Sequence, residues 1–92
     1  MIVRILTEGQ YNLPGAHLDR LNELDNRLVE VVESEDEGAF DGLLKEMLDV
    51  VREHGSPVPL DEIVESDIVL PEPDITLAEA ERIFTGEGII PD

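Results

Sequence analysis

Two stripes of apolar residues at helical spacing, separated by one short polar break, constrain the fold of this chain more than any other feature. Within each stripe the apolar residues recur every three or four positions, as they do on the buried face of a helix. The stripes consist of Leu18, Leu21, Leu24, Leu28, Val31 and Val32, and then of Phe40, Leu43, Leu44, Met47, Leu48 and Val51. Because only the short stretch "SEDEG" separates them, we predict two helices packed as an antiparallel αα-hairpin.

The residues that flank the stripes predict where the helices begin and end. The first helix is expected over residues 15–33, with Gly15 as an acceptable N-cap. Ser34 followed by Glu37 has the spacing of a capping box, in which side chains bond the first free amides of the second helix. The second helix should stop at His54, with Gly55 as its C-terminal cap.

The segment before the helices predicts a β-hairpin. Residues 2–6 are β-branched and apolar apart from Arg4, and residues 11–13 resume an alternation of apolar and polar positions. We expect Glu8-Gly9 at the tip of this hairpin, because Gly9 can adopt the positive φ that tight turns require. The side chains predicted to share the buried face are Val3, Ile5, Tyr11 and Leu13.

The remainder of the chain predicts shorter elements. "SPVPL" indicates a rigid turn, "LDEIV" a short helical turn, and "SDIVLP" a strand ended by Pro71. Thr76 and Glu79 have capping-box spacing, so a short helix is expected over residues 77–85, and Ile89 and Ile90 should hold the tail against the core. The order of elements predicts a single α+β domain over residues 1–92, with an N-terminal β-hairpin, a central antiparallel αα-hairpin, a further short strand and a short C-terminal helix.

The charge of the chain limits its partners. The formal net charge is −17, from 23 acidic and 6 basic residues, so its field repels nucleic acid and anionic membranes and favours a basic partner. No apolar run approaches the roughly 20 residues of a membrane-spanning helix. The chain has no cysteine, which excludes disulfides and thiol chemistry. We therefore expect a cytoplasmic protein that neither binds nucleic acid nor inserts into a membrane.

No arrangement of residues predicts catalysis. Ser34, Ser56 and Ser66 stand where turns or caps favour serine, and the carboxylates fall mostly on the solvent faces of the predicted helices. His17 and His54 lie at ends of the two helices that meet in an antiparallel hairpin, so they could share a site with Asp19 or Glu53 as a third ligand. The chain nevertheless has no ligand spacing of the His-x-x-x-His type, so we expect no catalytic residue, metal or cofactor.

Four segments resemble, in order and spacing, the PspA-associated family called PspAA. They are "MIVRILTEGQYNLP", "LDRLNELDNRLVEVVE", "VREHGSPVP" and "DIVLPEPDITLAEAERIFTGEGIIP", so the similarity covers essentially the whole chain. The family consists of small acidic proteins encoded beside PspA, the phage-shock membrane-stress protein. The resemblance implies a non-enzymatic accessory role in the envelope-stress response. It also implies that the chain reaches a membrane only through its partner.

The resemblance and the charge together predict salt-sensitive association with a PspA-type protein or another component of that system. Its contacts are expected at the acidic cluster between the two helices, formed by Glu33, Glu35, Asp36 and Glu37. The alternative is an acidic decoy or antitoxin-like protein that occupies the basic site of a nucleic-acid-binding partner. An apolar stripe left over on either helix could also form a homodimer interface.

Overall fold

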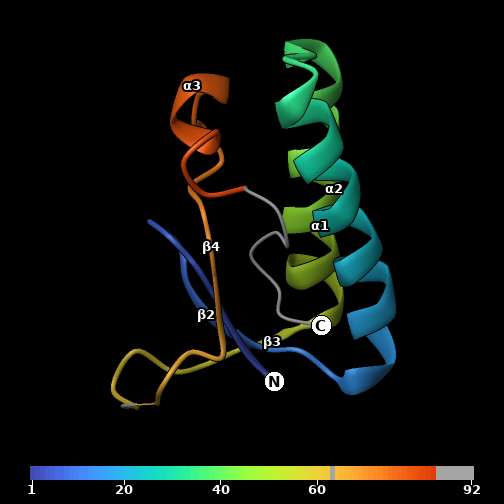
Figure 1. Ribbon diagram of the computed structural model, residues 1–92. Coiled ribbons are helices and arrows are strands. Elements are labelled where there is room, and N and C mark those ends of the chain that lie inside the picture. Colours follow the sequence, from blue (N-terminus) through green and yellow to red (C-terminus); the bar gives the residue numbers. More distant parts are fainter. Residues whose placement is uncertain (63, 85–92) are drawn as a thin grey trace.

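A computed structural model describes residues 1–62 and 64–84 of the chain. It confirms an α+β fold with an N-terminal β-hairpin, a central αα-hairpin, a further strand and a short helix (Figure 1). The strands are β1 (Ile2–Ile5), β2 (Gly9–Asn12), β3 (Ser56–Pro57) and β4 (Ile68–Leu70). The helices are the 3-10 helix η1 (Gly15–His17), α1 (Leu18–Glu33), α2 (Glu37–His54) and α3 (Leu77–Ala80).

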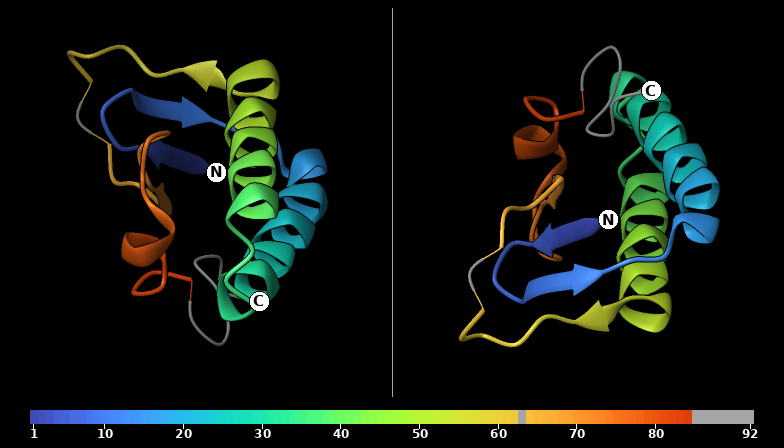
Figure 2. Two further views of the ribbon diagram at one scale, coloured as in Figure 1. Left: turned by 90° about the horizontal axis from the view of Figure 1, so that it is seen from above. Right: turned by 90° about the horizontal axis from the view of Figure 1, so that it is seen from below.

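The four strands form one sheet in the order β3-β2-β1-β4. β2 pairs antiparallel with both β1 and β3, whereas β4 pairs parallel with β1, with Val3 opposite Ile68. α1 and α2 lie side by side against one face of this sheet, so the molecule has two layers (Figure 2). The parallel pairing of β1 with β4 brings the last third of the chain beside its first residues.

The core lies between the two layers and is almost entirely aliphatic. Alternate strand residues such as Val3 and Ile5 point into it, and the stripes of α1 and α2 cover them. Its two phenylalanines, Phe40 of α2 and Phe84 after α3, meet edge to face with ring centroids 6.3 Å apart. This contact joins the segment around α3 to the first turn of α2.

The hairpin tip differs by one or two residues from the prediction. Ile5 pairs with Gly9, so the tip consists of Leu6, Thr7 and Glu8 rather than Glu8-Gly9. Gly9 does have a positive φ of 124°, as predicted, but Thr7 also has one of 74°. Of the four residues expected on the buried face, Tyr11 is only half-buried and the other three are fully buried.

The helix ends are capped by other residues than the sequence predicted. A 3-10 turn over residues 15–17 precedes α1, so its N-cap is His17 and not Gly15. The N-cap of α2 is Asp36 instead of Ser34, because α1 continues to Glu33 and Ser34 ends it. Gly55 does cap α2, but with an extended backbone at φ −86° rather than the left-handed one usual for a C-terminal glycine.

Three expectations for the last third of the chain change in the structure. Ser56–Pro57 of the predicted turn adds a short strand at the free edge of the sheet, where a proline is tolerated because its missing amide leaves no internal pairing unmet. The predicted helical turn after Pro59 is a single turn closed by the amide of Glu62. α3 is shorter than predicted, and Ile89 and Ile90 lie outside the described residues.

Candidate functional site

The link between α1 and α2 presents the four acidic residues predicted to contact a partner. These residues, which we call the acidic tip, are Glu33, Glu35, Asp36 and Glu37, and each is exposed. In residues 1–62 and 64–84 no salt bridge involves any of them. The structure therefore leaves the negative charge of the tip open to an outside cation.

The backbone of the acidic tip is tightly constrained. The amide of Asp36 donates to the carbonyl oxygen of Val31, and the amide of Glu35 donates to that of Val32, at 3.0 and 3.1 Å. This pair of bonds is the Schellman motif that ends many helices, in which glycine usually occupies the left-handed position. Here Glu35 occupies it, with φ 57°. The fold thus holds an acidic side chain at a position where glycine would be less strained.

Asp36 has a structural role within the tip. Its Oδ1 accepts a hydrogen bond of 3.1 Å from the amide of Ala39, and its carbonyl oxygen accepts one from the amide of Phe40. These bonds satisfy amides in the first turn of α2, and the negative charge suits that end of the helix dipole. Glu33, Glu35 and Glu37 are consequently the tip residues whose carboxylates are best placed for a partner.

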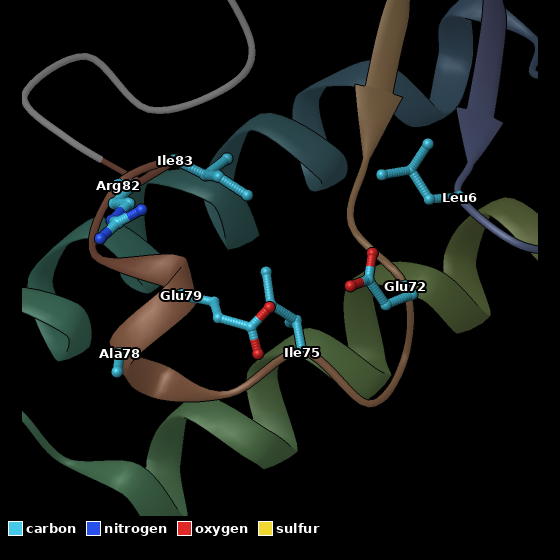
Figure 3. Close-up of a pocket in the computed structure, with 7 residues that line it drawn as sticks. All are labelled: Leu6, Glu72, Ile75, Ala78, Glu79, Arg82 and Ile83. Carbon is cyan, nitrogen blue, oxygen red and sulfur yellow. The ribbon is translucent and has the colours of Figure 1, made fainter.

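A second candidate site is an open hollow of about 500 Å³ beside α3, which we call the α3 hollow (Figure 3). It is lined by Leu6, Glu72, Ile75, Ala78, Glu79, Arg82 and Ile83. In Figure 3 the side chain of Ile75 lies between the carboxylates of Glu72 and Glu79. The hollow therefore combines an apolar floor with acidic groups. The sequence analysis did not identify it, because Leu6 comes from the hairpin and the other residues come from a segment more than 60 positions later.

The α3 hollow and the acidic tip lie at the same end of the molecule (Figure 1). The contact between Phe40 and Phe84 holds them together, since it attaches the chain just after Ile83 to the helix that starts at Glu37. The segment over residues 72–84 adds four carboxylates and one basic residue, Arg82. This end of the molecule is consequently strongly acidic.

Most of the basic residues are already paired with carboxylates elsewhere. Arg20 and Arg27 of α1 both bind Glu23, and Lys45 of α2 binds Asp49 at 3.2 Å. Arg52 forms a further salt bridge, with Glu8. None of these pairs includes a residue of the acidic tip or of the α3 hollow. Internal pairing therefore does little to lower the negative charge at that end.

One ion pair ties the hairpin tip to α2. Arg52 donates hydrogen bonds from Nε and Nη2 to the carboxylate of Glu8, the first at 3.0 Å. Its third nitrogen, Nη1, donates one to Asp49 at 3.2 Å. The hydrogen bond from Arg52 lowers the pKa of Glu8 below its usual value, and that from Lys45 lowers the pKa of Asp49. The bond to Glu8 in turn raises the pKa of Arg52. This two-point contact fixes the loop that carries Leu6.

The two histidines are brought together as the antiparallel arrangement predicted. The rings of His17 and His54 stack with centroids 4.1 Å apart and planes 12° from parallel. Stacked rings hold their nitrogen lone pairs in two separate, nearly parallel planes, so the pair does not converge on one metal ion in this arrangement. Among the residues described, no group of three or more His, Cys, Asp or Glu is placed to hold a metal. His54 also stands in the last turn of α2, where a cation suits the helix dipole.

Two of the serines singled out by the sequence, Ser34 and Ser66, form structural hydrogen bonds. Ser34 Oγ donates to the carbonyl oxygen of Val31, and Ser66 Oγ accepts from Gln10. Asp25 is fully buried on α1, which the sequence analysis did not predict. The spacing already indicated this burial, because Asp25 stands four residues after Leu21 and three before Leu28, on the apolar stripe.

No helix in the described part of the chain is long and apolar enough to span a membrane.

Comparison with known proteins places this fold in a family. The sequence profile of the PspAA family, described as PspA-Associated protein, matches residues 1–92, which is the full length given. No curated protein and no solved structure matches the chain.

Proposed function

The chain belongs to the PspAA family of PspA-associated proteins, and from that premise we propose that it acts by binding a PspA-type protein directly. The role is that of a non-enzymatic accessory protein in the phage-shock response to envelope stress. The observation that carries the proposal is the family match over residues 1–92. In this role the protein is cytoplasmic and meets a membrane only through its partner.

Electrostatics support a basic partner surface. The net charge of −17 produces a field that attracts cations over a distance of about 8–10 Å at moderate salt and repels nucleic acid. Four of the six basic residues are engaged in salt bridges within the described residues, so they do not offset the acidic tip. Association should consequently be faster and tighter at low salt.

We assign the first contact to the acidic tip, through Glu33, Glu35 and Glu37, with Asp36 holding the helix end beneath them. The exposure of all four supports this assignment, as does the left-handed backbone of Glu35, which keeps an acidic residue where glycine would be less strained. A homodimer is the other association that the surface permits, but two copies of net charge −17 repel each other.

The test is a binding measurement with the PspA-family protein encoded in the same host. The wild-type chain is titrated into the purified partner at 50 and 300 mM salt, and the dissociation constant is expected to rise with salt. The triple variant Glu33→Lys, Glu35→Lys and Glu37→Lys should weaken binding by about tenfold or more, because it reverses three charges at the contact.

A second triple variant provides the matched control. Glu53→Lys, Glu62→Lys and Glu65→Lys change the net charge by the same amount at exposed positions remote from the acidic tip. Equal losses in the two triple variants would mean that only total charge matters, and the assignment to the tip would be wrong. Absence of any complex at 50 mM salt would refute the proposed function.

A further inference from the structure

The α3 hollow exposes two large apolar side chains. Leu6 is 39% exposed and Ile83 is 38% exposed, although Ile75 between them is buried. An apolar hollow that is rimmed by polar groups is typical of protein interaction sites. The hollow therefore has the composition of a pocket for an apolar anchor.

Contacts within this chain fix the position of Leu6 in the hollow. The amide of Leu6 donates to the carbonyl oxygen of Leu70 at 3.1 Å, which extends the pairing of β1 with β4. On its other side, Thr7 has a positive φ of 74°, which is rare for a β-branched residue, and Glu8 is bound by Arg52. Such local strain persists where the surrounding contacts over-determine it, and it often occurs at binding sites.

The walls of the hollow restrict the charge of what can fill it. The carboxylate of Glu79 is oriented by a 3.0 Å bond from the Thr76 hydroxyl, and Glu72 stands on the opposite side. These two carboxylates outnumber Arg82, the one cation in the lining, so an uncharged apolar group alone would desolvate a net negative charge, which is unfavourable. The fitting occupant thus carries apolar side chains and cations close together.

We propose that the α3 hollow receives the apolar side of a basic amphipathic helix of the partner protein. Its Lys or Arg side chains meet Glu72 and Glu79, and the acidic tip at the same end of the molecule attracts its further cations. This inference rests on the proposed function, and it names the surface and the chemistry through which binding occurs. A second copy of this chain is disfavoured as the occupant, because it has the same charge of −17.

The test uses two synthetic peptides of leucine and lysine with the same composition. One has all its leucines on one helical face, and the other is scrambled so that it has no apolar face. Titration of the labelled protein should shift the NMR signals of Ile75, Ala78 and Ile83 with the amphipathic peptide. The scrambled peptide should bind at least tenfold more weakly.

Matched variants distinguish the hollow from exposed leucine in general. Leu6→Ser should weaken binding of the amphipathic peptide about tenfold. Leu60→Ser should leave it unchanged, because Leu60 is 97% exposed on the β3–β4 connection, at the opposite end from α3. Ala78→Gln is a second variant of the hollow, and Ala78 lies at an exposed position of α3. It should weaken binding without changing net charge.

The outcomes of these experiments distinguish a failure of this inference from a failure of the proposed function. Equal binding of both peptides, or unchanged binding in Leu6→Ser and Ala78→Gln, would overturn the inference. If those variants bound the PspA-family protein normally, the proposed function would stand and the hollow would be the wrong surface. If that protein did not bind while the peptide still required the hollow, the proposed function would fail and the hollow would stand. A wild-type dimer that dissociates in Leu6→Ser would identify a second copy as the occupant and overturn the inference.

Discussion

Gly55 stands where the last turn of α2 meets the β-hairpin, and a methyl group added there should be costly. A Cβ on Gly55 would lie 2.5 Å from the carbonyl oxygen of Val51 and 3.0 Å from Cβ of Tyr11. The amide of Gly55 donates to that same oxygen at 2.8 Å, so the backbone cannot move away without losing the bond that ends the helix. Any residue can adopt its φ of −86°, so the cost of a larger side chain would come from steric overlap and not from backbone strain.

The expected magnitude follows from the cost of overpacking. Forcing an extra methyl group into a filled site typically costs about 1–3 kcal/mol, which we expect for Gly55→Ala. Gly42→Ala provides the matched control, because Gly42 lies inside α2 with nothing within 4 Å of an added Cβ. There alanine should stabilise the helix by about 0.5–1 kcal/mol. The same substitution should therefore have opposite effects on stability inside the helix and at its C-terminal cap.

The measurement is urea unfolding of the two variants and the wild type, followed by circular dichroism. The free energies of unfolding should differ between the variants by about 1.5–4 kcal/mol. In thermal unfolding this corresponds to midpoints roughly 6 °C or more apart for a domain of this size. A Gly55→Ala variant as stable as the wild type would refute the reasoning, since the helix end would then have room for a methyl group.

Three further predictions concern the caps and the ion pair. Glu35→Gly should raise the free energy of unfolding by about 0.5–1 kcal/mol in urea titrations, because glycine adopts the left-handed backbone without strain; no gain would contradict the strained geometry. Asp36→Ala should lower it by about 1 kcal/mol, through loss of the bond to the Ala39 amide, whereas Asp36→Asn should retain most of it. Because Arg52 lowers the pKa of Glu8, the pair stabilises the fold above the usual pKa of glutamate, and this stability is lost as the pH falls through the lowered value. Glu8→Gln should consequently cost at most about 1 kcal/mol at pH 7 and nothing at pH 2, and an equal cost at both would be inconsistent with the ion pair.

The helices could be predicted because their signal is local. Apolar residues three and four apart fall on one face of a helix whatever surrounds them, so α1 and α2 followed from their stripes. The proximity of His17 and His54 followed equally, since an antiparallel hairpin with a short link places those ends together, although the stacking of their rings did not. The caps were less predictable. Ser34 and Asp36 are both favourable N-cap residues, and the choice depends on the Schellman bonds at the end of α1.

The two candidate sites also differ in whether the sequence could predict them. The acidic tip was visible in the sequence, because its four carboxylates are neighbours along the chain and any short link between helices is exposed. The α3 hollow was not visible, because it requires Leu6 to lie beside residues 72–83. That proximity comes from the parallel pairing of β1 with β4, which no spacing within either strand indicates.

The sequence by itself determined the α+β class, the antiparallel helices and the acidic surface, because periodicity and charge are properties of neighbouring residues. The tertiary structure alone decided which strand lies beside β1, that Arg52 reaches Glu8, and that Gly55 leaves no room for a side chain. The first two features join residues more than 40 positions apart, and the third depends in part on Tyr11, which is equally distant in sequence from Gly55. Such contacts form only when the whole core packs, and a local pattern holds no information on which distant partner completes them.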